Sequence, residues 1–142
     1  MAENCSVPLS DPLSSSPTLD RCPCLSGVSY ADCCGRLHRG DARAATAEQL
    51  MRSRYAAFAV PHADYLLRSW HPSTRPETLE LDPTLRWVRL DIGRTVRGGP
   101  FDTEGSVEFT AYYRQDGQRG EQHEVSRFVK IDGGWLYLDA LD

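Results

Sequence analysis

The sequence contains no long hydrophobic run, and no segment is apolar over enough residues to cross a bilayer as a helix. It also lacks the basic start and apolar stretch of a signal peptide, so we expect a cytoplasmic protein without a membrane span. Lysine is nearly absent, because Lys130 is the single lysine among 16 basic residues. The formal net charge of −4 argues against broad electrostatic binding to nucleic acid.

The first twenty residues are rich in serine and proline and show no apolar pattern. Such a composition buries too little surface to offset chain entropy, so we predict a disordered tail over residues 1–20. The whole chain has 142 residues, of which 40% are hydrophobic and 25% charged. These values are ordinary for a soluble globular protein and leave room for one compact domain with an appendage.

Cysteine is concentrated in one short segment, where eight residues separate the pair Cys22 and Cys24 from the pair Cys33 and Cys34. Zinc prefers four soft ligands at tetrahedral corners, and a pair of thiols on each arm of a tight loop supplies them. Pro23 keeps the first arm extended. The sequence therefore predicts a zinc-binding motif over residues 21–40. Because protein fills all four positions, we expect the zinc to be structural rather than catalytic.

Other interpretations of these cysteines remain open. A disulfide framework would require an oxidising compartment, and an iron–sulfur cluster usually spaces its thiolates more widely. His38 lies four residues after Cys34 and is an alternative ligand for one thiol, but a solvated loop histidine is the simpler expectation.

Downstream, the hydrophobic period first indicates helices. Thr46 and Gln49 form a capping box, and Pro61 should end the helix that they begin. Its expected apolar face consists of Ala47, Leu50, Met51, Tyr55 and Phe58, while Arg52 and Ser53 are expected to point elsewhere and Arg54 lies at the border. A second short helix is expected over residues 62–70.

From Leu85 onward the period changes from 3.6 to 2, which indicates strands. We expect strict alternation over residues 85–92, further strands near residues 107–114, 121–131 and 135–140, and a turn at Asp132. Two to three helices followed by long antiparallel strands must pack on one face of a curved sheet. The predicted fold class is therefore α+β, with a cone-like domain over residues 44–142.

The cysteine pattern resembles the SEC-C zinc motif, known from the tail of the SecA translocase motor. With Leu50-Met51-Arg52-Ser53-Arg54-Tyr55, Trp70-His71-Pro72-Ser73-Thr74-Arg75-Pro76 and His123-Glu124-Val125-Ser126-Arg127-Phe128, the chain looks like the YchJ-like family of small bacterial proteins. This resemblance implies zinc at the four cysteines and a domain similar to nuclear transport factor two and the cystatin-like cone. Leu25 departs from the pattern, which usually has glycine there.

Two classes of function follow. In the first, which we favour, a zinc-stabilised module binds a protein partner, with the ribosome or the export machinery as candidates; domains of this kind also often form homodimers through the sheet. In the second, the cone pocket serves a small molecule or a metal-independent enzyme. Candidate pocket residues are Arg54, Asp64, Tyr65, His71, Glu108, His123 and Glu124. Glu108 is also a candidate for a cross-strand ion pair with Arg127 or Arg114.

Overall fold

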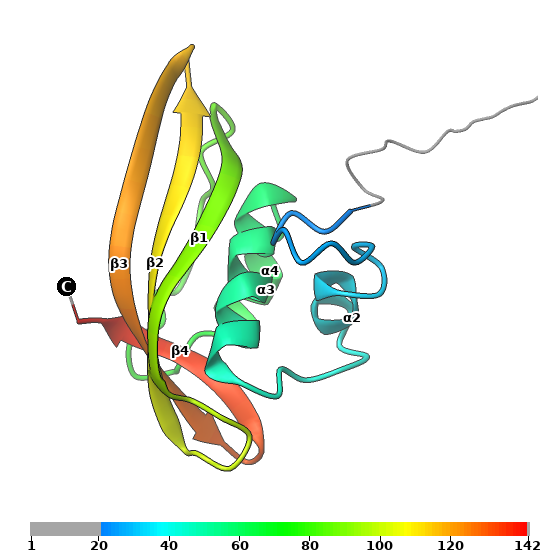
Figure 1. The fold of residues 1–142 in the computed structure, drawn as a ribbon, viewed down its shortest axis with the longest axis vertical. Helices are drawn as coiled ribbons and strands as arrows, with labels where there is room; N and C mark the ends of the chain where they lie inside the picture. The colour runs from blue at the N-terminus through cyan, green and yellow to red at the C-terminus, as the bar shows by residue number, and fades with distance from the viewer. Residues whose placement is uncertain (1–20, 142) are drawn as a thin grey trace, which may run out of the picture.

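The computed structural model describes residues 21–141, so the tail predicted over residues 1–20 lies outside the described part. Within that part the elements are α2 (Cys34–Arg39), α3 (Ala47–Ala59), α4 (Ala63–Arg68), β1 (Leu85–Arg97), β2 (Glu104–Gln115), β3 (Gln118–Ile131) and β4 (Gly134–Ala140). The strands pair in chain order, β1-β2-β3-β4, and every pair is antiparallel. Figure 1 shows the helices on one side of the curved sheet, which confirms the predicted α+β fold.

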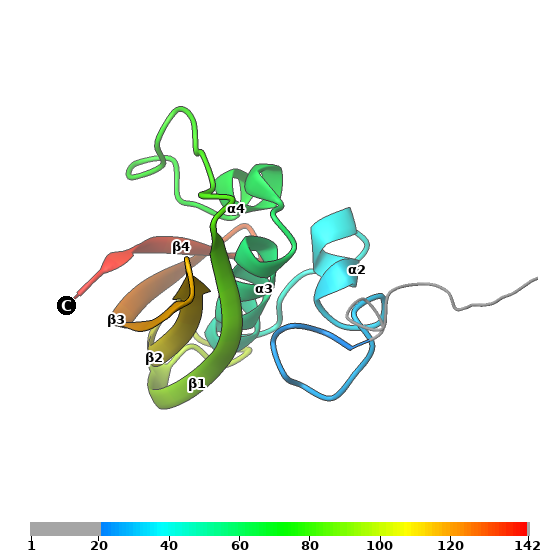
Figure 2. The same ribbon diagram turned by 90° about the horizontal axis from the view of Figure 1, so that it is seen from above.

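Helix α3 is the central layer, with the sheet on one side and the cysteine segment with α2 on the other (Figure 2). Its sheet side joins a core in which Leu66 and Phe128 are almost completely buried. Its other side buries Ala56 against the cysteines. Because α3 is covered on two sides, Ser53 is fully buried, and the expectation that it points away from the core is wrong.

The ends of the helices follow local signals in the sequence. Thr46 Oγ1 accepts a hydrogen bond from the Gln49 amide at 3.1 Å, and Gln49 Oε1 accepts one from the Ala45 amide at 2.6 Å, so the predicted cap is present. Helix α4 is shorter than expected. After it ends, Trp70 bridges to Tyr137 of β4, so the chain has already joined the sheet where a last helical turn was predicted.

Two of the three hairpins of the described sheet turn at Asp-Gly pairs, Asp116-Gly117 between β2 and β3 and Asp132-Gly133 between β3 and β4, whereas a longer loop joins β1 to β2. Asp132 and Gly133 have φ values of 52° and 80°, which are those of the tight turn that suits the twist of two paired strands. The turn predicted at Asp132 is therefore confirmed. The alternation expected in β1 is wrong, because the register shifts between Trp87 and Arg89. This bulge places Trp87 and Leu90 on the same concave face of the sheet.

Candidate metal centre and adjoining cavity

The four cysteine sulfurs converge on one point. Their Sγ atoms all lie within 4.8 Å of one another, with Cys24 and Cys33 at 3.6 Å and Cys33 and Cys34 at 4.0 Å. A tetrahedral zinc ion with bonds of about 2.3 Å places its sulfur ligands roughly 3.8 Å apart. All four thiols are free rather than paired in disulfides. The donor set and its spacing therefore fit a tetrahedral metal ion.

The backbone of the cysteine loop closes on itself to present the thiols. Arg21 bridges to Ser29, and the Cys22 amide donates to the Val28 carbonyl oxygen at 2.9 Å. The turn between them passes through Leu25, whose φ of 68° lies in the left-handed region that glycine adopts without strain. This backbone position explains why the SEC-C pattern usually has glycine where this chain has leucine.

The thiols perturb one another strongly. Hydrogen bonds from the Cys22 and Cys34 thiols hold the pKa of Cys24 far below its usual range. The hydrogen bond to Cys22, followed by the one to Cys24, raises the pKa of Cys34, and the hydrogen bond to Cys24 is the first cause that raises the pKa of Cys22 to about 12. These directions favour one thiolate among the three, and a bound divalent cation would supply the positive charge that further thiolates require.

The cysteine loop and α2 are fastened to the α+β domain by buried and half-buried polar contacts. Arg52 of α3 donates to the Cys24 carbonyl oxygen at 2.8 Å, and Arg68 of α4 donates to the His38 carbonyl oxygen at 2.7 Å. Arg52 also pairs with Glu48, one turn earlier on α3. Both helices therefore hold the metal segment in place through its main chain.

His38 lies in α2 and is 3% exposed, so the expectation of a solvated loop histidine is wrong. Its Nε2 donates to the Ser53 carbonyl oxygen at 2.8 Å, and its Nδ1 accepts the hydroxyl of Tyr30. Burial lowers the pKa of His38, which favours this neutral ring. Because both ring nitrogens are engaged, His38 joins α2 to α3 and does not belong to the cysteine cluster.

Replacing Tyr30 with phenylalanine tests this connection. Tyr30→Phe keeps the ring but leaves the buried Nδ1 of His38 without a donor, so we expect a loss of about 1–2 kcal/mol in the free energy of unfolding. Denaturation of the metal-loaded protein measures the loss, and metal stoichiometry should not change. Tyr113→Phe is the matched control, since the Tyr113 hydroxyl makes no hydrogen bond within residues 21–141. Equal losses in the two variants would contradict the assignment.

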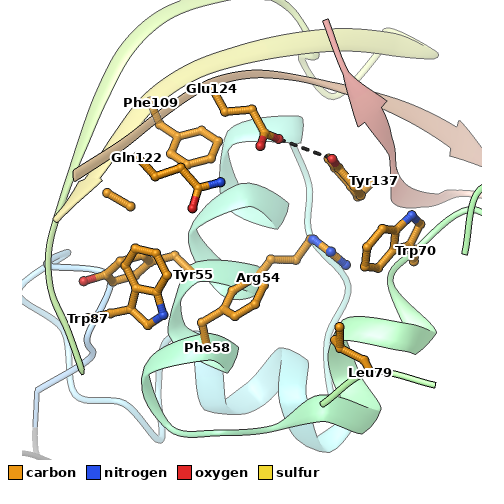
Figure 3. Close-up of a pocket in the computed structure, with 11 residues that line it drawn as sticks. Arg54, Tyr55, Phe58, Trp70, Leu79, Trp87, Phe109, Gln122, Glu124 and Tyr137 are labelled. Atoms are coloured by element: carbon orange, nitrogen blue, oxygen red, sulfur yellow. Dashed lines mark hydrogen bonds between the residues drawn. The ribbon is translucent and has the colours of Figure 1, made fainter. Parts of the chain in front are cut away.

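A cavity of about 250 Å³ lies between α3 and the concave face of the sheet (Figure 3). Its walls are mainly aromatic and hold three polar side chains that carry a charge or an amide. The lining residues are Arg54, Tyr55, Phe58, Trp70, Leu79, Trp87, Phe109, Ala111, Gln122, Glu124 and Tyr137.

Of the pocket candidates taken from the sequence, the structure places Arg54 and Glu124 in this cavity. Three others lie near α4 instead. Asp64 pairs with Arg68 at 3.1 Å on the surface, and the buried Tyr65 hydroxyl contacts Ser53 Oγ at 2.6 Å. His71 uses its Nδ1 to accept the Ser73 amide at 3.0 Å.

Glu108 and His123 form a pair on the outer face of the sheet, with 2.7 Å between carboxylate oxygen and ring nitrogen. The hydrogen bond from His123 holds the pKa of Glu108 below its usual range. The expected ion pair of Glu108 with Arg127 or Arg114 is therefore wrong; Arg127 instead pairs with Asp139 at 2.7 Å. This site lies on the opposite face of the sheet from the cavity.

Gln122, Trp87 and Tyr137 are cavity residues that the sequence analysis did not identify. Parity along β3 carried a signal for the first, because Gln122 and Glu124 alternate in step with the buried Phe128. Trp87 faces the cavity because of the bulge in β1, and Tyr137 faces it because β4 pairs with β3 and runs back past Trp70. Neither event has a local signal in the sequence.

None of the helices within residues 21–141 is long and apolar enough to cross a membrane. Comparison with known families gives two matches. The profile of the YchJ middle NTF2-like domain matches residues 46–140, and the SEC-C motif matches residues 20–36.

Similar proteins and structures agree with these matches. The chain is 54% identical to a UPF0225 protein of Streptomyces coelicolor, over 84% of this chain and 93% of that protein. It is 50% identical to a UPF0225 protein of Corynebacterium glutamicum, over 82% and 93%. A solution structure of a SEC-C motif containing protein from Rhodopseudomonas palustris has a TM-score of 0.73 and 34% identity, with 84% and 95% coverage. A crystal structure of such a protein from Psychrobacter arcticus has a TM-score of 0.69 and 28% identity, with 83% and 80% coverage.

Proposed function

This chain belongs to the UPF0225 family, with a SEC-C motif ahead of a YchJ-type NTF2-like domain, and from this premise we propose that it is a zinc-stabilised protein-interaction module. The observation that carries the proposal is an exposed apolar tip on the cysteine loop, formed by Leu25 and Val28, which are 56% and 45% exposed. Zinc closes the loop, and the tip contacts the partner.

Zinc is the metal that four thiolates at tetrahedral spacing favour. Cys22, Cys24 and Cys34 are buried, and all four ligands come from the protein. A site closed in this way has no free position for water or substrate, so the metal is structural. We place the zinc motif over residues 21–40 and the α+β domain over residues 44–142, which is the division taken from the sequence.

Leu25 supports a binding role because its backbone conformation is unfavourable and its exposed side chain gains no burial energy that would offset this cost. A left-handed backbone costs a non-glycine residue roughly 1–2 kcal/mol, and glycine would avoid that cost. The Leu25 side chain is more than half exposed, so burial within this chain does not offset the cost. An unfavourable backbone conformation of this kind suggests a functional role. A role of Leu25 as an apolar anchor for a partner would explain it.

Affinity capture from host extract with a loop variant tests the proposal. The bait Leu25→Asn/Val28→Thr removes the apolar tip, and asparagine tolerates the left-handed backbone. Leu141→Asn/Val96→Thr is a matched control, since these residues are also 56% and 45% exposed. We expect the wild type and the control to recover one partner that the loop variant loses, with one zinc retained in all three. A loop variant that keeps the partner would contradict the proposal.

The ribosome and the export machinery are the candidate partners, in the cytoplasm, and a homodimer through the sheet is the alternative assembly. The net charge of −4 disfavours a nucleic-acid partner. Capture repeated at raised salt separates a nucleic-acid partner from an apolar protein contact, because binding to nucleic acid weakens steeply with salt whereas apolar contact does not.

A second candidate function is binding or conversion of a small molecule in the cavity between α3 and the sheet. Its aromatic walls, one arginine and one carboxylate favour this candidate. Within the described residues Glu124 is the one acidic group that lines the cavity and no histidine does, so paired acid–base catalysis lacks a second group. Binding is therefore better supported than catalysis.

A further inference from the structure

Arg54 is a buried guanidinium without a carboxylate partner. It is 6% exposed, and its Nη1 donates to the Leu66 carbonyl oxygen and to Ser69 Oγ, both at 2.7 Å. These acceptors are neutral. No ion pair within residues 21–141 includes Arg54. A buried charge is costly unless an opposite charge compensates it, so the position favours an anion.

The guanidinium lies against two aromatic rings that meet edge to face at the wall of the cavity, with 5.2 Å between the ring centres (Figure 3). Its central carbon is 5.0 Å from the ring centre of Trp70 and 4.6 Å from that of Tyr137. Cation–π contact with the two rings stabilises the charge but uses none of the N–H donors, which lie in the guanidinium plane. Within residues 21–141 only Nη1 has acceptors, so Nε and Nη2 are left for another acceptor.

Within the described residues Trp70 also carries an unpaired donor, but this atom has no exposed surface from which a ligand in the cavity could reach it. Its indole nitrogen is buried and has no hydrogen-bond partner within residues 21–141. The donors open to a ligand are therefore Nε and Nη2 of Arg54, and an anionic ligand is an acceptor.

The rest of the cavity wall is aromatic, and it determines which group of the ligand lies beyond the anion. Tyr55, Phe58, Trp87 and Phe109 enclose the space beyond Arg54, which has a volume of about 250 Å³. A dry cavity of about 150 Å³ already admits benzene, so there is room for one substituted ring. We propose that this cavity binds a small aromatic carboxylate, with the carboxylate on Arg54 and the ring between the aromatic walls.

Glu124 modulates this site without neutralising it. Its carboxylate accepts the hydroxyls of Ser126 at 2.5 Å and Tyr137 at 3.3 Å, and it forms no ion pair with Arg54. Glu124 therefore weakens the binding of an anion at Arg54, because its negative charge repels that anion. A ligand bound by Glu124 instead of Arg54 would be a cation, and this is the alternative that the experiment must distinguish.

Benzoate is the first probe, with benzamide as its neutral analogue and benzylamine as its cationic one. For the zinc-loaded full chain we expect benzoate to bind with a dissociation constant on the order of 1 mM and benzamide roughly tenfold or more weakly. Absence of benzoate binding at 10-fold that concentration, equal binding of benzamide, or tighter binding of benzylamine would overturn the proposal.

Three variants assign the effect to residues. Arg54→Met should weaken benzoate binding roughly tenfold or more, whereas Glu124→Gln should strengthen it. Glu108→Gln, on the outer face of the sheet, should leave it unchanged. Should Arg54→Met fail to fold, Arg54→Lys keeps the charge but loses the planar fork, and weaker benzoate binding is again expected. Wild-type affinity in the arginine variant, or weaker binding in Glu124→Gln, overturns the assignment.

The three tryptophans report where the probe binds. Trp70 and Trp87 line the cavity, whereas Trp135 is buried elsewhere and donates to the Ala45 carbonyl oxygen at 3.2 Å. In nitrogen-resolved NMR spectra, benzoate should shift the indole signals of Trp70 and Trp87 and leave that of Trp135 in place. A shift of Trp135 alone places the probe outside the cavity and refutes the proposal. The proposal is independent of the protein-interaction role, so either can fail without the other.

Discussion

Removal of the metal is expected to unfold the segment over residues 21–39 and to lower the thermal midpoint of the chain by about 10 °C. Structural zinc sites of this type contribute on the order of 10 kcal/mol to folding of the segment that they organise. Here that segment also covers one side of α3, where Ala56 is buried against the cysteines. Its loss exposes apolar surface and breaks the bonds from Arg52 and Arg68, so about 3 kcal/mol of the stability of α3 and α4 should go with it.

Calorimetry before and after chelation measures this effect, and added zinc should restore the midpoint. Cys34→Ser should reproduce the chelated state with no bound zinc, because the thiol is 3% exposed and central to the cluster. Cys5→Ser is the matched control, since this fifth cysteine is outside the motif, and should keep one zinc per chain. A chelated protein with an unchanged midpoint would refute a structural role for the metal.

Phe128→Ala is expected to cost about 3–5 kcal/mol in the free energy of unfolding, measured by urea denaturation. Phe128 is 1% exposed and is among the largest fully buried side chains, and its ring centre lies 5.8 Å from that of Tyr137. The substitution opens a cavity between β3, β4 and α3, and the rigid surroundings can collapse only in part.

The control is the same change at an exposed site. Phe101 is 99% exposed in the loop between β1 and β2, so Phe101→Ala should change stability by no more than about 0.5 kcal/mol. An equal effect of the two substitutions would mean that the core does not centre on Phe128.

The sequence located well what depends on neighbouring residues. Four thiols within one short loop can reach a common ion whatever follows, so their convergence was predictable from spacing. The cap at Thr46 and the turn at Asp132 likewise depend on backbone geometry over a few residues. The α+β class followed from the change of hydrophobic period, which reports one buried face per element.

The sequence alone misplaces residues on the side of α3 that the cysteine segment covers. The apolar stripe of α3 predicts that Ser53 points away from it, and the position of His38 after the cysteines predicts a solvated loop histidine, because polar side chains are mostly exposed. In the structure the cysteine segment covers that side of α3, and the two residues share a buried hydrogen bond from His38 Nε2 to the Ser53 carbonyl oxygen. Periodicity describes one covered face and carries no information about a second cover.

The sequence by itself determined the metal-binding loop, the order of helices and strands, and the family. The tertiary structure alone decided which side chains meet: it moved Trp87 inward by a bulge and set Arg54 against Trp70 and Tyr137. The physical reason is distance along the chain. A cavity is formed by side chains from α3, the chain after α4 and all four strands, and only the packing of helix on sheet determines which of them face one another.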